Sequence, residues 1–106
     1  PAELLPLCES LGVPFIYDVH HHRCLADDLT EQEATEQAMK TWNREPLFHL
    51  STPKDGWGAS NPRPHADMID PADFPPFWRD LPVTVEIEAK AKELAIRQLQ
   101  KDLSLI

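Results

Sequence analysis

The sequence has few basic residues and no long apolar run, and each of these absences excludes a class of protein. Ten Lys and Arg residues stand against eighteen Asp and Glu residues, which gives a formal net charge of −8. This balance argues against a simple basic surface for nucleic acids. It leaves metal sites open, because bound divalent cations add positive charge that the formal count omits. No run of about 18 apolar residues occurs, so we expect no membrane-spanning helix.

Cysteines and phosphate-binding loops are also scarce. The two cysteines, Cys8 and Cys24, form no CxxC motif, and we expect reduced thiols and a cytoplasmic location rather than a disulfide or a zinc pair. Neither GxGxxG nor GxxxxGKS/T is present, so a nucleotide-binding fold would lack its usual phosphate loop. The length of 106 residues allows one small domain. Because the chain starts at Pro1 rather than at methionine, we expect a piece of a longer protein.

Helices and short apolar strands alternate along the chain. Gly12 supplies a helix stop, and Thr30 with Glu33 forms a capping box. Asp70 and Pro71 are typical of an N-cap and a first helical position. Helices are expected over residues 2–12, 29–42, 71–81 and 89–102. Strands are expected between them, over residues 13–18, 46–51 and 83–89.

This alternation predicts an α/β fold. Strands that are joined by connections long enough to cross over indicate a parallel sheet with right-handed crossovers. In such folds the active site lies at the carboxyl ends of the strands. Here each predicted strand delivers a residue able to bind a metal at or near its end, namely Asp18, His49 and Glu88. The connecting loops are expected to add His20, His21, His22, His65 and Asp67.

Every one of these residues has an ordinary structural alternative. A lone histidine at a strand end is more often structural or exposed than a ligand. Asp18 could be a helix N-cap, and Glu86 with Glu88 could form a half-exposed strand face. Their coincidence at three successive strand ends favours a metal site. Mixed imidazole and carboxylate ligands suit Zn, Mn or Fe, and such ions about 3.5–4 Å apart hydrolyse phosphodiesters.

Four stretches of the chain together resemble the C-terminal part of the UV-damage endonucleases. They are LGVPFIYDVHHH, PLFHLS, HADMI and VEIEAKAKELA, which occur in the family's order and at similar spacing. The resemblance implies that residues 1–106 are a C-terminal fragment of one TIM-barrel domain and supply three βα units. It implies a DNA-repair endonuclease that nicks damaged double-stranded DNA 5′ to UV photoproducts and related lesions. It also implies a cluster of three divalent ions, with manganese favoured and zinc or magnesium as alternatives.

The resemblance carries over to individual ligands. It implies that Asp18, His49 and Glu88 share one ion and that His21 and His65 hold another. Asp18 and Glu88 are then the catalytic residues, acting through metal-activated water. His20 stays an alternative to His21 as the direct ligand. Candidates for a supporting role around these ligands are His20, His22, Asp67 and Glu86.

Two departures from the family matter. The family has a lysine, which can be carboxylated, two residues before the strand-two histidine, and here that position is Leu47. Period-two alternation places Leu47 with His49, and Glu86 with Glu88, so we hypothesise that Glu86 supplies the missing carboxylate. The earlier barrel strands are also absent. We therefore expect the chain to self-associate or to need the N-terminal barrel half, and to show little or no nuclease activity alone.

The sequence also offers candidate residues for contact with DNA, and it leaves two other functions open. Candidates for DNA binding are Arg23, Lys54, Trp57, Arg63 and Lys90. Of these, Trp57 is expected either to stack on a base or to pack over its own loop or against a helix. The first alternative function is a metal-dependent sugar isomerase or epimerase of the same barrel superfamily, for which an acidic surface is well suited. The second is a non-catalytic truncated domain that acts by association.

Overall fold

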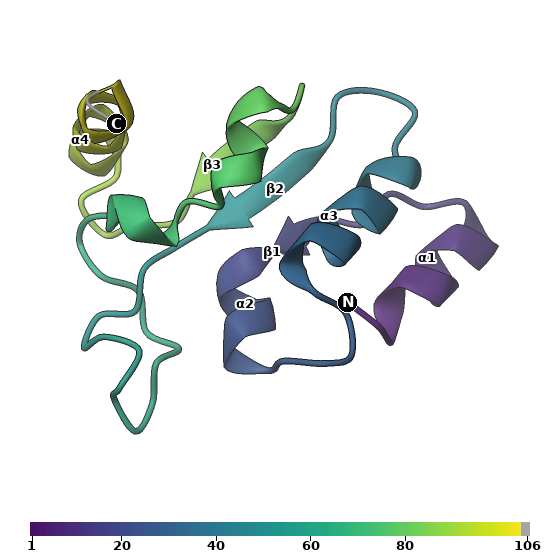
Figure 1. Cartoon of the computed structure of the whole chain (residues 1–106), viewed down its shortest axis with the longest axis horizontal. Coiled ribbons are helices and arrows are strands. Elements are labelled where there is room, and N and C mark those ends of the chain that lie inside the picture. The colour runs from purple at the N-terminus through teal and green to yellow at the C-terminus, as the bar shows by residue number, and fades with distance from the viewer. Residues whose placement is uncertain (105–106) are drawn as a thin grey trace.

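A three-stranded parallel sheet with helices around it forms the frame of the molecule, and the computed structural model describes residues 1–104 (Figure 1). The elements run in the order α1 (Leu4–Leu11), β1 (Tyr17–Asp18), α2 (Val19–Cys24), α3 (Glu31–Lys40), β2 (Leu47–Leu50), η1 (Pro71–Asp73), η2 (Pro76–Asp80), β3 (Thr84–Ile87) and α4 (Glu93–Ser104). The η elements are short 3₁₀ helices. Helices α1 and α4 lie at opposite ends of the long axis (Figure 1).

The sheet confirms the predicted α/β class and its parallel strands. Strand β2 lies in the centre, with β1 and β3 on either side of it, and both pairs are parallel. The register pairs His49 with Asp18 on one side and with Glu86 on the other. Beyond β3, the backbone N–H of Glu88 donates to the carbonyl of Leu50 at 2.8 Å. The sheet therefore aligns these acidic residues beside His49 at its carboxyl edge.

The core lies between the sheet and helix α3. Tyr17, Phe48 and Trp78 are buried, and the Phe48 and Trp78 rings are 5.1 Å apart between centroids. Ala34 and Ala38 of α3 are fully buried, and their small side chains let the helix approach the strands closely. Burial of each large aromatic side chain contributes about 1.5–3 kcal/mol, so this cluster fixes the strands whose ends carry the polar residues.

Two of the predicted helix signals are confirmed. Gly12 ends α1 in the left-handed region, at φ 66°, and its N–H bonds to carbonyls in the last turn of the helix. This backbone conformation favours glycine, which has no Cβ. Thr30 and Glu33 form a reciprocal capping box at the start of α3. Residues 2–12 and 29–42 thus contain the expected helices.

Other expectations are wrong in detail. The three consecutive histidines form part of helix α2 rather than a loop, because the Asp18 side chain caps that helix. Residues 71–81 form two 3₁₀ turns instead of one helix, since Pro75 supplies no N–H and disfavours helical geometry before it. The last helix begins at Glu93 rather than at residue 89, and Lys92 precedes it at φ 51°. Strand β1 contains only two residues of the expected six.

The sheet is open, and apolar side chains remain outside the core. Strands β1 and β3 each have one edge without a partner strand among residues 1–104. Three leucines of α1, namely Leu4, Leu7 and Leu11, are 53–65% exposed. None of the helices described here combines the length and apolar character needed to cross a membrane.

Candidate metal centre

Asp18, His49 and Glu88 come together at the carboxyl edge of the sheet. Each contributes one possible ligand atom, and these atoms all lie within 4.8 Å of one another. Asp18 ends β1, His49 lies in β2, and Glu88 follows β3, so three neighbouring strands build the group. Two bonds of about 2.0–2.2 Å to one metal allow its ligands to lie up to about 4.4 Å apart. A small contraction therefore adapts this group to an ion.

One carboxylate oxygen of Glu88 has no hydrogen-bond donor in this group. Its Oε1 is buried and has no hydrogen-bond partner among the described residues, although it lies 3.3 Å from His49 Nδ1. A buried carboxylate oxygen without a donor is costly, and such groups are normally paired or bound to metals. The residues present thus fit a divalent cation.

Asp18 has a second, structural role. Its Oδ1 accepts the backbone N–H of His21 at 3.0 Å and caps helix α2. The N-cap alternative for Asp18 is therefore confirmed. It is compatible with metal binding, because a carboxylate has two oxygens and about four lone pairs.

His21 and His65 meet around a separate small cavity. The cavity has a volume of about 130 Å³ and adjoins Asp18. Its lining consists of Asp18, His20, His21, Cys24, Arg63 and His65. His65 is held in place by a β-bridge between the chain at Pro53 and at His65. The two histidines are not part of the close group at His49, and they remain candidates for a second ion.

His20 is used to hold the long loop. Its side chain is buried, and its Nε2 donates to the carbonyl oxygen of Pro62 at 2.8 Å. Because a carbonyl can only accept, Nε2 carries the hydrogen, and Nδ1 accepts from the Ser51 hydroxyl. With both ring nitrogens occupied, His20 supports the structure. Among the histidines of α2 that the structure describes, His21 is the one whose ring nitrogens make no hydrogen bond to the protein.

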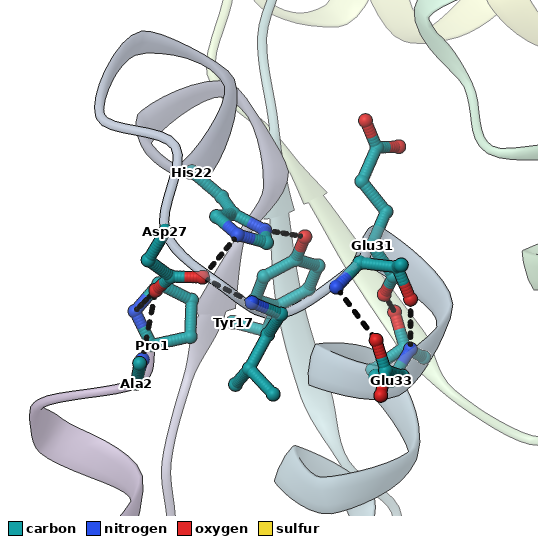
Figure 2. Close-up of polar contacts among 10 residues, drawn as sticks. Pro1, Ala2, Tyr17, His22, Asp27, Glu31 and Glu33 are labelled. Atoms are coloured by element: carbon teal, nitrogen blue, oxygen red, sulfur yellow. Dashed lines mark hydrogen bonds and ion pairs between the residues drawn. The ribbon is translucent and has the colours of Figure 1, made fainter.

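His22 belongs to a partly buried hydrogen-bond network with Tyr17 and Asp27 (Figure 2). Its Nδ1 lies 2.6 Å from the Tyr17 hydroxyl and its Nε2 lies 3.0 Å from Asp27 Oδ1. Burial, with a contribution from the Glu31 charge, raises the pKa of Tyr17 well above its usual range. The phenol therefore stays protonated and donates to Nδ1, which leaves the Nε2 hydrogen for Asp27.

Asp27 is itself strongly hydrogen-bonded. Its Oδ2 accepts the backbone N–H of Ala2 at 2.9 Å (Figure 2), and its Oδ1 accepts that of Leu29 at 2.9 Å. The Ala2 N–H is the main cause that holds the pKa of Asp27 well below its usual range, and the Leu29 and His22 bonds act in the same direction. His22 and Asp27 thus fix α2 to the start of the chain.

Glu86 and Glu88 both reach His49, as the alternation of the strand predicts. Glu86 Oε2 lies 3.3 Å from His49 Nε2, on the other side of the ring from Glu88. Leu47 is half-buried and pairs with Thr84. Asp67 is exposed and does not line the cavities found beside Asp18 and Glu88 in residues 1–104. Glu86 is therefore closer to the candidate site than Asp67.

Some of the basic residues lie beside the acidic group. Arg63 and Lys90 line an open groove of about 560 Å³ together with His65, Glu86 and Glu88. Lys92 also lines this groove and was not among the predicted DNA-binding residues. Its position depends on the turn before α4, and no local sequence pattern predicts that turn. Lys54 is exposed on the loop and does not line this groove.

Arg23 and Trp57 are engaged with the protein. The Arg23 guanidinium donates to both carboxylate oxygens of Glu31, at 2.9 and 3.0 Å, and to the carbonyl of Asp73 at 2.8 Å. The indole N–H of Trp57 donates to Asp73 Oδ1 at 2.9 Å, and its ring packs on His20. Trp57 thus packs against helix α2, one of its predicted alternatives, and stays 39% exposed.

Comparison with known proteins places this geometry in a family. The family described as UV-endonuclease UvdE matches residues 1–106. A UV DNA damage endonuclease of Deinococcus radiodurans is 39% identical over 106 residues, covering 94% of this chain and 33% of the relative. Another, of Halalkalibacterium halodurans, is 37% identical over 111 residues, covering 96% and 34%.

A solved structure gives the same result for the fold. The crystal structure of SacUVDE aligns with a TM-score of 0.78 at 27% identity, over 94% of this chain and 34% of that one. The three parallel strands match part of its TIM barrel. This chain spans about a third of the length of the curated relatives that it matches. The chain belongs to the UV-endonuclease UvdE family.

Proposed function

We propose that this chain forms the metal-binding third of a DNA-repair endonuclease that nicks the backbone 5′ to UV photoproducts and related lesions. The observation that carries the proposal is the convergence of Asp18, His49 and Glu88 at the carboxyl edge of a parallel sheet. The relatives named above are UV DNA damage endonucleases, which favours a nuclease over a sugar isomerase. The substrate is then damaged double-stranded DNA.

Asp18, His49 and Glu88 would hold one divalent ion, and His21 with His65 would hold another beside the smaller cavity. Carboxylate and imidazole donors suit manganese, with zinc or magnesium as alternatives. Bound ions of this kind lower the pKa of water and stabilise charge on a leaving oxygen. The residues of this chain fix the ligands in place, because Asp18 is also tied to α2 and His65 is tied to the β-bridge.

The groove beside Glu88 offers a place for the DNA backbone. Arg63, Lys90 and Lys92 line it, and Lys and Arg side chains neutralise phosphates. They lie next to the acidic ligands, so a phosphate held by them would lie near the ion. Lys54 and the exposed part of Trp57 remain proposed contacts from the loop, and Arg23 has less freedom because it is paired with Glu31. Extruding a damaged nucleotide costs least where its pairing is already disturbed.

The test joins this chain to the N-terminal two-thirds of the Deinococcus radiodurans relative, in place of the third that it matches. The fusion protein is incubated with Mn²⁺ and UV-irradiated duplex DNA, and nicks 5′ to the photoproducts are counted. We expect nicking by the fusion protein and none by the 106-residue chain alone. His49→Ala and Glu88→Ala should each abolish it, whereas the exposed-site control Glu36→Gln should not.

Two results would contradict the proposal. One is a fusion protein that folds, as judged by circular dichroism, and does not nick damaged DNA. The other is full nicking by the His49→Ala variant. As an independent measurement, the 106-residue chain is titrated with Mn²⁺. The proposal expects binding that the Asp18→Ala, His49→Ala and Glu88→Ala changes together remove.

A further inference from the structure

The His49 ring lies between two carboxylates of strand β3. Glu88 Oε1 is 3.3 Å from Nδ1, and Glu86 Oε2 is 3.3 Å from Nε2. This placement follows from the sheet, because His49 is paired with Glu86 in the register and Glu88 is two residues farther along on the same side. Each ring nitrogen therefore faces its own acidic side chain.

The two carboxylates differ in their surroundings. Glu88 is 30% exposed, belongs to the close group with Asp18, and has a buried oxygen without a hydrogen-bond donor. Glu86 is 58% exposed and lies outside that group. Because Glu88 belongs to the close group and faces Nδ1, we assign this nitrogen of His49 to the candidate ion. Nε2 points to the side where Glu86 stands.

We propose that Glu86 is a positioning residue for His49: it accepts the Nε2 hydrogen and so presents an unprotonated Nδ1 to the ion between Asp18 and Glu88. The proposal rests on the metal site of the proposed function. Histidine ligands generally donate their other ring N–H to a carboxylate or carbonyl, which fixes the tautomer and the ring orientation. The exposed Glu86 side chain is able to adjust its direction to His49 without displacing a packed neighbour.

The alternative partner of the ring makes this role necessary. Without an ion, Glu88 also accepts a hydrogen readily, because its Oε1 lacks a donor and lies beside Nδ1. A hydrogen on Nδ1 would block the lone pair that a metal needs. Glu86 favours the opposite tautomer, with the hydrogen on Nε2. It therefore keeps His49 ready for the ion.

The test uses the 106-residue chain with Zn²⁺ as a diamagnetic probe. Proton–nitrogen NMR correlations of the histidine rings distinguish protonated, unprotonated and metal-bound nitrogens. In the wild type we expect Zn²⁺ on Nδ1 of His49 and a hydrogen on Nε2. Glu86→Leu should weaken Zn²⁺ binding about tenfold to a hundredfold and, without metal, increase the Nδ1-protonated tautomer.

Two further variants sharpen the result. Glu86→Gln keeps an acceptor oxygen without the charge, so it should show a smaller loss than Glu86→Leu. Glu36→Leu, at an exposed position of α3, should change neither the tautomer nor the affinity. The proposal is overturned by Zn²⁺ on Nε2 of His49, by ligation through Glu86 itself, or by a Glu86→Leu chain with unchanged tautomer and affinity. A wild-type chain that binds no Zn²⁺ would instead contradict the metal site. The comparison of the His49 tautomer between the metal-free wild-type and Glu86→Leu chains would then still test the role of Glu86.

Discussion

Among single residues, Glu88 is the one that we expect a bound ion to stabilise most. Its buried Oε1 lacks a donor, so an uncharged amide should be tolerated better in the metal-free chain than the carboxylate is. We expect Glu88→Gln to leave metal-free thermal stability unchanged or slightly higher. In the wild type, Mn²⁺ at a hundred times its Kd should add about 2.7 kcal/mol of stability. Thermal unfolding with and without Mn²⁺ measures both effects, and a Glu88→Gln chain that keeps the full Mn²⁺ stabilisation would contradict the ligand role.

Asp27 makes the free energy of unfolding depend on pH in the acidic range. Backbone N–H groups, that of Ala2 first, hold its folded-state pKa below the ordinary value of 3.8. A carboxyl whose pKa is depressed in the folded state stabilises the protein above the unfolded pKa, and this contribution is lost as the pH falls through the folded value. We therefore expect the free energy of unfolding to decrease below about pH 4. Asp27→Asn should flatten this part of the profile, measured by urea unfolding from pH 7 to pH 2, and an unchanged slope would contradict the assignment.

Three residues of the candidate metal centre were predictable from the sequence. Asp18, His49 and Glu88 could be selected because parallel strands bring their carboxyl ends to one edge, and the structure gathers these three. The pairing of His20 with Ser51 and Pro62 depends on a loop path that no local pattern specifies. The roles of the histidines within the triplet were therefore not separable from the sequence alone.

At the scale of elements, one buried carboxylate anchors the long loop that carries His65. Asp73 accepts from the Thr52 hydroxyl at 2.7 Å and from the Trp57 indole at 2.9 Å. Asp73→Ala removes the acceptor of both donors. Since Thr52 is half-buried and Trp57 is partly exposed, water replaces part of what is lost, and we expect a cost of about 1 kcal/mol for each hydrogen bond. We expect faster amide hydrogen exchange at Lys54 and Ala66, whose N–H groups bond across the base of the loop.

Asp55→Ala is the matched control for this change, because Asp55 is exposed in the same loop. It should leave the exchange of both amides at the wild-type rate. Equal protection in the Asp73→Ala and wild-type chains would show that the loop is held by other contacts.

The errors in the predicted elements have a common physical cause, which is that the elements concerned are short. Helix α2 is only six residues long, too short for a periodic apolar pattern, and it forms because Asp18 caps it and because His20 and His22 are buried. The region 71–81 has the expected N-cap at Asp70, but Pro75 interrupts it. Long elements with caps, such as α3, were predictable, whereas short ones depend on tertiary contacts.

At the scale of the whole molecule, three strands leave an open sheet with an apolar helix face beside it. Leu7 and Leu11 of α1 are more than half exposed, and unpaired strand edges promote association. We expect the 106-residue chain to self-associate as its concentration rises, in a sedimentation-velocity series. Leu7→Glu combined with Leu11→Glu should shift the series toward monomer, because charge opposes burial of this face.

A chain that sediments as a monomer at every concentration would contradict that expectation. In the fusion protein with the relative's N-terminal two-thirds, the same two substitutions provide a further comparison. If this face packs against the rest of a barrel, they should lower the thermal stability of the fusion protein as well.

The metal centre depends on three neighbouring strands that bring Asp18, His49 and Glu88 to one divalent ion. Anomalous diffraction at the manganese edge, from crystals of the chain grown with Mn²⁺, locates this ion. We expect an anomalous peak within bonding distance of all three side chains, with His49 bound through Nδ1. Manganese bound elsewhere, with these three side chains free of it, would show that they do not form a metal centre.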